Sequence, residues 1–552
     1  MKIKSTTLTI VMLLFAAMLV SAQITERQLP AEWKNLVYGG RFMDRFLPMH
    51  PVGELTRDTW GAPEVVPRYT DNGLEDNIIS YWGGNVKVDK DGKYNLFVCG
   101  WPETSPKGHM FWAKSTLYQA VADNSFGPYK VRRAIGPGHN PEIFQLKDGR
   151  YVIYIIDGYY ISNNLNGPWE RKKFDFNPRD RKIIEGLTNV TFAQREDGTY
   201  LAVCRGGGIW FSETGESSYN QVTDKRVYPP VKGRFEDPVV WRTNIQYHLI
   251  VNDWLGRIAW YMRSKDGVNW KTEPGEAYLP GLAVYEDGTK VDWFKYERLK
   301  FLQDEYGRAT QAHFAVIDTI KWNDLEYDNH SSKHIVIPVV KGRLLTVLNE
   351  KPLTAKTKTI EVKIEAEEDF NPNTDIDLES IRFGASEEVN FGRGCKLKET
   401  KESGNDLILV FDGSGNGFTD DNFAGKLLGK TSKGELLFGY SRLPGVEYIE
   451  PILSARQPKV LQKNKGLSFN VEVQNFGQVA SEKAKVELRV EIDKKMQKIA
   501  SGVVIPLNPF EKTTVGIQSA RKLEKGKEYK AKVLITSGSL KPVVFETSVV
   551  LK

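Results

Sequence analysis

Between residues 83 and 307 the chain repeats one short pattern, and this repeat limits the choice of fold more than any other feature. Each copy is a polar step into an apolar strand, then a tight turn, then a second apolar strand. Four copies are clear and the fifth is looser; their equivalent residues are Asn85, Asn140, Asn189, Asp237 and Arg298. These positions are 55, 49, 48 and 61 residues apart. A period of about 40–60 residues built from strand-turn-strand units predicts a β-propeller, here with five blades.

The fold class predicted for the whole chain is all-β. All thirteen Trp residues lie between Trp33 and Trp322, so the composition changes near residue 350. Beyond that point, strict alternation such as that at 467–473 indicates half-buried antiparallel strands. We predict a five-bladed β-propeller at 30–352, followed by two β-sandwich domains. The first is a β-rich linker or sandwich domain at 353–450, and the second is an immunoglobulin-like sandwich at 451–552.

The N-terminus has the features of a signal peptide. Lys2 and Lys4 precede an apolar run from about residue 10 to 20, and small residues at 20–22 provide a cleavage site. We therefore expect residues 1–22 to be removed and the protein to be secreted or periplasmic. No later apolar run has the length of a membrane span, so none is predicted.

The net charge limits the kinds of molecule that the protein could bind, and the cysteine content limits its disulfide bonds. The formal charge of +6 falls to +4 when Lys2 and Lys4 are removed, over about 530 residues. That excess is too small to indicate nucleic acid, but it is compatible with an anionic glycan. Three cysteines form an odd, sparse set, which argues against a disulfide scaffold and favours buried free thiols.

The repeats resemble a group of known enzymes. Units of strand, Asp-Gly-x-Tyr and strand are closed by Ser…Gly-Pro-Trp at 162–169 or by Ser-Lys-Asp-Gly-Val-Asn-Trp at 264–270. Over about residues 70–350 this is similar to the five-bladed propeller glycosidases of families 43, 32 and 117. The resemblance implies a glycoside hydrolase that acts on a carbohydrate in the central pocket of the propeller. It also indicates a distinct family related to these three.

The chain departs from the family 43 pattern at the blade positions. Family 43 enzymes carry two Asp and one Glu where this chain has Asn85, Asn140 and Asn189. Because Asn cannot act as a general base, we assign these three residues to substrate binding. Glu185, followed by Gly186, resembles the family's acid motif. Asp237, within Glu-Asp-Pro at 236–238, resembles the Asp of the Asp-Pro dipeptide that binds substrate hydroxyls in invertase-like enzymes.

Glycoside hydrolysis needs two carboxyl groups across the scissile bond. The strand register directs Asp237 and Glu142 toward the axis, while Glu236 and Glu297 lie one residue earlier, at the turn into the strand. Together with Glu185 these residues are the catalytic candidates. Several carboxyls in one pocket raise the pKa of at least one of them, as a general acid requires. The structural alternative is that Glu236 and Glu297 form ion pairs with neighbouring arginines.

Other candidates would hold the sugar. His139 lies at a channel opening, Trp82 offers an aromatic face, Arg205 suits a carboxylate or sulfate group, and Asp253 ends a strand in the fourth repeat. Trp101 and Trp254 are further candidate platforms. No His, Cys or Asp cluster has metal-ligand spacing, so we predict no cofactor and leave open a structural ion such as Ca²⁺ on the axis.

Two other functions remain open at this stage. A polysaccharide lyase on uronate glycans could use His139 as base and Arg205 to neutralise the uronate. A non-catalytic glycan-binding protein would account for the three Asn residues at blade positions. The leading interpretation is an exported, exo-acting glycoside hydrolase on a plant or algal polysaccharide.

Overall fold

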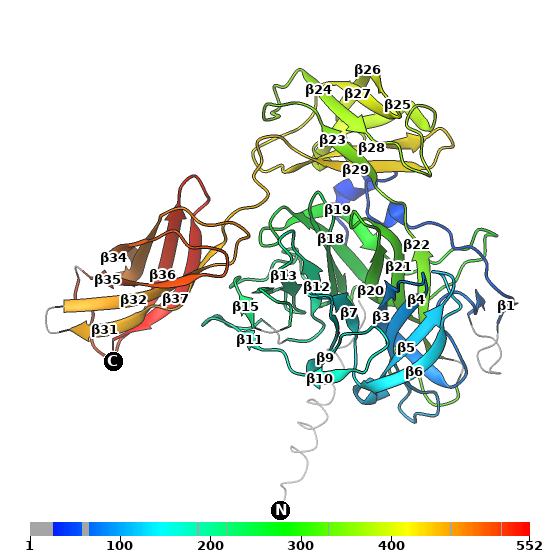
Figure 1. Cartoon of the computed structure of the whole chain (residues 1–552), viewed down its shortest axis with the longest axis horizontal. Helices are drawn as coiled ribbons and strands as arrows, with labels where there is room; N and C mark the ends of the chain where they lie inside the picture. Colours follow the sequence, from blue (N-terminus) through cyan, green and yellow to red (C-terminus); the bar gives the residue numbers. More distant parts are fainter. Residues whose placement is uncertain are drawn as a thin grey trace, which may run out of the picture.

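The computed structural model describes residues 26–57, 66–184, 187–216, 218–328, 330–463, 466–519 and 521–551. The predicted signal peptide lies outside these ranges. Within them the regular structure is almost entirely β, as the sequence predicts, with one short α-helix, α2 (Ser386–Val389) (Figure 1). No helix of the described part is long and apolar enough to cross a membrane.

Five sheets follow one another along the chain from Ile79 to Pro338, each built from consecutive strands (Figure 1). Their strands pair antiparallel except for β11 and β15 of the third sheet, which are parallel. The first contains β3 (Ile79–Val88), β4 (Tyr94–Pro102), β5 (Thr116–Ala122) and β6 (Lys130–Pro137). The second contains β7 (Glu142–Gln145), β8 (Tyr151–Ile155), β9 (Gly158–Ser162) and β10 (Glu170–Lys172). The third contains β11 (Phe176–Asn177), β12 (Thr191–Gln194), β13 (Tyr200–Val203), β14 (Ile209–Ser212) and β15 (Tyr219–Gln221).

The fourth sheet contains β16 (Phe235–Arg242), β17 (Tyr247–Asp253), β18 (Ile258–Ser264) and β19 (Lys271–Tyr278). The fifth contains β20 (Lys295–Gln303), β21 (Ala309–Ile317) and β22 (Ser332–Pro338). A two-stranded sheet of β1 (Leu55–Thr56) and β2 (Arg68–Tyr69) precedes them. The strands β3, β7, β12, β16 and β20 contact one another in sequence, and β20 also contacts β3. These five strands therefore form a closed series around one region of the molecule.

The repeat forms these sheets for simple reasons. Gly92, Gly149 and Gly198 of the Asp-Gly turns have φ values of +78°, +92° and +85°, which favour glycine in the tight hairpins. The apolar faces of neighbouring sheets pack into shared cores. One such core joins β8 of the second sheet to β12–β15 of the third, through Tyr154 and Phe192. Burial of these aromatic side chains is the main stabilising term.

The structure corrects one equivalence between the repeats. In β3, β16 and β20 a β-bulge interrupts the pairing with the next strand, after Trp82, Glu236 and Glu297 respectively. Aligned on these bulges, the residue of the first repeat that matches Asp237 is Gly83. The matching residues all have a left-handed backbone: Gly83 (+66°), Asn140 (+54°), Asn189 (+50°), Asp237 (+51°) and Arg298 (+53°). The assignment of Asn85 to this position was wrong by two residues. Asn85 lies beyond the bulge, where β16 and β20 have Val239 and Lys300, and a glycine takes the left-handed position of the first repeat.

The next region is a closed seven-stranded barrel, with strand order β23-β24-β27-β26-β25-β28-β29. Its strands are β23 (Arg343–Val347), β24 (Thr359–Ile364), β25 (Ile376–Gly384), β26 (Cys395–Ser403), β27 (Asp406–Asp412), β28 (Ala424–Thr431) and β29 (Leu436–Arg442). The expectation of a sandwich for 353–450 was therefore wrong. Alternating strands suit either architecture, and the parallel pairing of β23 with β29, which closes the barrel, brings in a strand that precedes residue 353.

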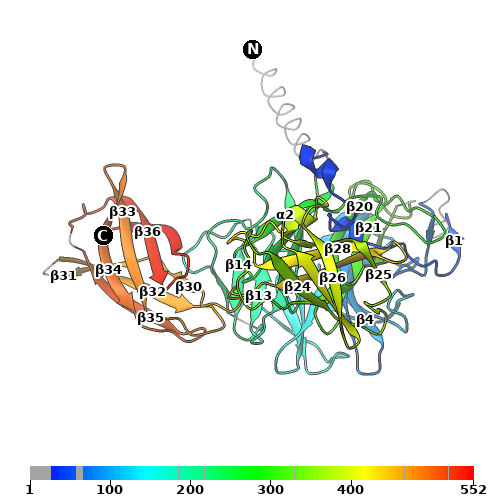
Figure 2. The same ribbon diagram turned by 90° about the horizontal axis from the view of Figure 1, so that it is seen from above.

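The C-terminal region consists of two four-stranded sheets that share one core (Figure 2). One contains β30 (Leu453–Ala455), β31 (Lys459–Lys463), β32 (Gly466–Asn475) and β35 (Lys512–Gln518). The other contains β33 (Ala484–Ile492), β34 (Lys495–Val504), β36 (Glu528–Ser537) and β37 (Val543–Val550). Arg179, near the third of the five sheets, donates to Gln474 (2.7 Å) and to the carbonyl of Ser454 (3.1 Å), which joins this region to the rest.

A buried ion pair within the fourth sheet is hydrogen-bonded to the barrel region. The Arg263 guanidinium lies 2.6 Å from Glu273 and donates to the Ser386 hydroxyl at 2.9 Å. The other oxygen of Glu273 accepts from Asn390 at 3.1 Å, and Lys426 donates to the Asn390 side chain. These groups are buried, so each depends on its partners rather than on water.

We expect Glu273→Leu to lower the free energy of unfolding by about 3–5 kcal/mol, because it leaves the buried Arg263 without its counter-ion. Urea unfolding followed by Trp fluorescence is the measurement, since every Trp lies between residues 33 and 322. The control is Glu361→Gln, which breaks a half-exposed pair with Lys401 and should cost under about 1 kcal/mol. Equal effects of the two variants would contradict the role of this pair.

Candidate functional site

A cavity of about 260 Å³ lies at the start of the five first strands. One residue from each repeat, the one before the left-handed position, lines it: Trp82, His139, Thr188, Glu236 and Glu297. The left-handed backbone conformation turns the chain at the start of the strand, so the side chain of the preceding residue points toward the cavity. The repeat thus brings five side chains of different chemistry, from five sheets, to one place.

The left-handed residues form a hydrogen-bonded layer beneath this cavity. Asn140 donates to Asn189 (2.7 Å), and Asn189 donates to both Asp237 (2.9 Å) and Glu236 (3.0 Å). Arg298 forms an ion pair with Asp237 (2.9 Å) and donates to the backbone oxygen of Asn140 (3.3 Å). Asn140, Asn189 and Asp237 also line the cavity, so these three predicted residues lie together as expected.

Glu142 and Asn85 lie farther along the strands and do not line this cavity. Glu142 forms a buried ion pair with Lys300 and accepts hydrogen bonds from the Thr191 hydroxyl (3.2 Å) and the Phe192 backbone (3.1 Å). Asn85 makes two hydrogen bonds to the backbone of Ile143 (2.7 and 2.9 Å). Both residues border a larger basin of about 1060 Å³ formed by the later part of the first strands. In this arrangement Glu142 neutralises a lysine, and Asn85 joins the first two sheets.

Glu297 is a buried carboxylate with two ammonium groups beside it. Its side chain is 2% exposed; Lys295 lies 3.6 Å away, and Lys321 donates to its other oxygen. Burial alone would raise the pKa of Glu297, but Lys321 and Lys295 more than offset this and hold that pKa below its usual value. Glu297 is therefore ionised at neutral pH.

Glu236 has the opposite environment. Burial and the neighbouring Asp237 carboxylate raise the pKa of Glu236 to about 7, against smaller opposing effects of Lys321 and Arg205. Arg205 lies 3.5 Å from Glu236, and neither cation approaches it as Lys321 approaches Glu297. The pKa values of two glutamates that line one cavity are thus moved in opposite directions, which is the arrangement an acid-base pair requires.

The cavity walls carry hydrogen-bonding groups without partners in the described structure. They are the side-chain oxygens of Asn140 and Thr188, Nε of Arg205 and the indole nitrogen of Trp254. These atoms are buried, so they belong to the interior of the cavity walls and not to the surface that the cavity offers to a ligand.

The aromatic platform differs from the one that the sequence suggested. Trp82 is 2% exposed and Trp101 is 1% exposed; both pack edge-to-face with His109. The exposed rings at this cavity are Trp112 (37%) and Trp322 (45%), which have more surface to offer a sugar ring. Neither was predicted, because they come from connecting segments outside the repeat.

Lys321 was also missed by the sequence analysis. It lies between β21 and β22, four residues after the end of β21, and its ammonium lies 4.6 Å from the centre of the Trp82 ring. No repeated spacing marks this connection. The signal that could have drawn attention to it is the pair Lys321-Trp322, a cation followed by an aromatic in a loop.

The remaining predicted residues are placed as follows. The His139 ring is within hydrogen-bonding distance of the Ser115 hydroxyl (2.9 Å), and burial lowers the pKa of His139 well below its usual value. Asp253 does not line the cavity; it pairs with Arg27 and accepts the Arg234 backbone N–H at 2.9 Å. Glu185 lies outside the described residues. Among those described, no group of three His, Cys, Asp or Glu side chains could hold a metal ion.

Comparison with known proteins does not assign a family. No family model and no curated protein matches the sequence. Among solved structures, a protein of unknown function from Dyadobacter fermentans is 12% identical, over 53% of this chain and 92% of that one, with a TM-score of 0.31. A glycoside hydrolase is 10% identical over 82% and 97% of the two chains, with a TM-score of 0.35. The GH43 protein BlXynB from Bacillus licheniformis is 8% identical over 86% and 91%, with a TM-score of 0.33. Likeness at this level does not establish a shared activity.

We expect Glu236→Gln to change how stability depends on pH. With a pKa of about 7, folded Glu236 keeps its proton where the unfolded chain, with an ordinary value near 4.5, has released it. The stability from this proton is complete below the unfolded value and is lost as pH rises through 7. Wild type should therefore lose up to about 1.4 kcal/mol per pH unit, relative to Glu236→Gln, between about pH 5 and 7. Parallel urea-unfolding curves of the two proteins across this range would contradict the assignment.

Lys321→Met should raise the pKa of Glu297, because burial then acts with one ammonium fewer to oppose it. A ¹³C NMR titration of the glutamate carboxyl carbons measures this, with Glu297→Gln to identify the resonance. The control is Lys87→Met, which removes a lysine at the basin on the far side and should leave Glu297 unchanged. An unshifted Glu297 resonance in Lys321→Met would show that Lys321 does not control this carboxylate.

Proposed function

We propose that this chain is a glycoside hydrolase whose two catalytic carboxyl groups are Glu236 and Glu297. The observation that carries the proposal is that one cavity contains two glutamates whose surroundings move their pKa values in opposite directions. Burial and Asp237 keep a proton on Glu236, while Lys321 and Lys295 keep Glu297 ionised. Proton donation to a leaving oxygen and attack on a sugar carbon need this division of roles.

The proposal includes the architecture around the site. We assign the five sheets to the blades of a five-bladed propeller, with the cavity on its axis. A pocket on the axis of a propeller suits the end of a sugar chain better than an open groove would, so the proposed action is exo. The signal-like N-terminus supports export to the periplasm or the medium.

Each wall residue has a part in the proposed reaction. Glu236 donates its proton to the glycosidic oxygen as that bond breaks. The Glu297 carboxylate either attacks the anomeric carbon or activates the water that does so. Asn189 donates to Glu236 and Asp237 together and so fixes their positions. Trp112 or Trp322 would stack on the sugar ring, and Arg205 would meet a hydroxyl or an anionic substituent.

A polysaccharide lyase is the second candidate. His139 lines the cavity and is held neutral by burial, so it could accept a proton from a uronate sugar. Arg205, which lines the same cavity, could neutralise the uronate carboxylate. A lyase would leave an unsaturated product that absorbs ultraviolet light, whereas a hydrolase would not.

The test is product release from a panel of plant and algal oligosaccharides by wild type, Glu236→Gln and Glu297→Gln. We expect monosaccharide release by wild type and a loss of about 10²-fold or more in each variant. Wild-type activity should fall above about pH 7 as Glu236 loses its proton. The control is Glu305→Gln, an exposed residue at the far basin, which should behave as wild type.

Other outcomes would point elsewhere. An unsaturated product whose formation survives both variants but fails in His139→Ala would favour the lyase. Saturable glycan binding without any product would favour the binding protein. Full activity in Glu236→Gln would remove Glu236 from the mechanism.

A further inference from the structure

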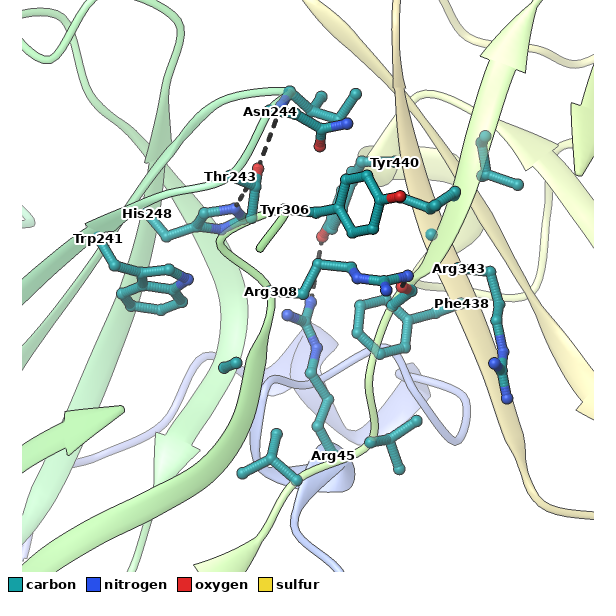
Figure 3. A pocket seen from close by; sticks show the side chains of 18 of the residues that line it. Arg45, Trp241, Thr243, Asn244, His248, Tyr306, Arg308, Arg343, Phe438 and Tyr440 are labelled. Carbon is teal, nitrogen blue, oxygen red and sulfur yellow. Dashed lines mark hydrogen bonds between the residues drawn. The ribbon is translucent and has the colours of Figure 1, made fainter. Parts of the chain in front are cut away.

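A second pocket, of about 270 Å³, lies where the five sheets meet the barrel (Figure 3). Its walls are the turn between β16 and β17, the turn between β20 and β21, the connection from β22 to β23, and β29. Tyr306, 38% exposed, and Asn244 lie at its mouth, while Arg45 and His248 are buried. None of these residues belongs to the cavity that contains Glu236 and Glu297.

Arg45 is a buried cation without a counter-ion. Its side chain donates to the Tyr440 hydroxyl at 3.2 Å, and Figure 3 shows it reaching toward that residue. The guanidinium carbon lies 4.5 Å from the centre of the Phe42 ring and 4.2 Å from that of Phe438. Its Nε has no hydrogen-bond partner, and it forms no ion pair with any carboxylate of the described residues.

The other two arginines of the pocket differ from Arg45. Arg308 pairs with Asp304 (2.7 Å) and Glu367 (2.7 Å), and Arg343 lies 3.5 Å from Glu367. Their charges are balanced within the protein, and the lining carboxylate Glu365 lies 3.2 Å from Lys363. Arg45 is therefore the charged lining residue that has no ion-pair partner among the described residues. Aromatic faces offset part of the cost of burying a cation, but an anion beside it would offset far more.

The aromatic residues in the other walls of the pocket suit a ligand that contains a ring. Trp241 stacks on His248, with 4.8 Å between ring centres and 11° between planes. The two nitrogens of His248 already interact with the Tyr261 hydroxyl (2.6 Å) and the Thr243 hydroxyl (3.3 Å). Arg45 already covers one face of Phe438, and Arg308 lies 5.0 Å from the centre of the Tyr306 ring. An occupant's body would therefore meet the remaining surfaces of these two rings, and Arg45 remains for its charge. The volume is close to the lower end of the range for small-molecule sites, about 300 Å³.

We propose that this junction pocket binds a small carboxylate carried on a six-membered ring, with the carboxylate against Arg45. Both an aromatic acid and a sugar acid have this chemistry. The proposal is independent of the glycosidase assignment, because it concerns different residues and its readout is binding.

The test is isothermal titration calorimetry of the full chain with benzoate, with glucuronate and with neutral benzyl alcohol. We expect saturable binding of at least one acid and none of the alcohol. Arg45→Met should weaken that binding at least about tenfold, because it removes a charge-assisted contact. The control, Arg132→Met, removes an exposed arginine outside the pocket and should bind as wild type does.

A second variant covers the case in which Arg45→Met fails to fold. Tyr306→Ala keeps the buried cation and removes an exposed wall, so it should fold and bind the acid several-fold more weakly. Benzoate binding without glucuronate binding would assign the pocket to aromatic acids, and the converse would assign it to sugar acids. No saturable binding of either acid, equal binding of benzyl alcohol, or acid binding unchanged in Arg45→Met or Tyr306→Ala would overturn the proposal.

Discussion

The site depends on one buried network, in which Arg298, Asp237, Asn189 and Asn140 are hydrogen-bonded in series. Each residue has a left-handed backbone, and each belongs to a different sheet. In a low-dielectric interior such a network is stable only when its members are satisfied together. This network joins the starts of four sheets. It also fixes the orientation of the side chain that precedes each of its four residues. The cavity above it is a consequence of that layer.

The chemistry of the cavity comes from unequal neighbours around similar carboxyls. Glu236 and Glu297 occupy the same position in successive repeats, but only Glu297 has Lys321 and Lys295 beside it. Glu142 shows a third outcome, because a buried lysine neutralises it within the strands. One repeated fold position therefore yields a protonated acid or a carboxylate according to what the connecting segments bring to it.

The barrel also matters beyond its own core. It meets the fourth sheet through Arg263 and Glu273, and β29 supplies Phe438 and Tyr440 to the wall around Arg45. The junction thus contains two buried arginines, one with a carboxylate partner and one without. Arg263, with its carboxylate partner, is a structural contact, whereas Arg45, without one, marks a candidate binding site.

The sequence by itself determined the β-rich class, the five repeats and the places where their polar residues enter the first strands. These follow from local alternation and Asp-Gly turns, which need no distant partner. The repeat also predicted that one site contains Glu236, Asp237, Glu297, Asn140 and Asn189, because equivalent positions of successive repeats lie close together in the fold. The tertiary structure decided the rest. Gly83 and not Asn85 took the left-handed position of the first repeat, the β23–β29 pair closed a barrel, and Lys321 reached Glu297 from a segment without a repeat. Each depends on contacts between residues far apart in the chain, which no local pattern encodes.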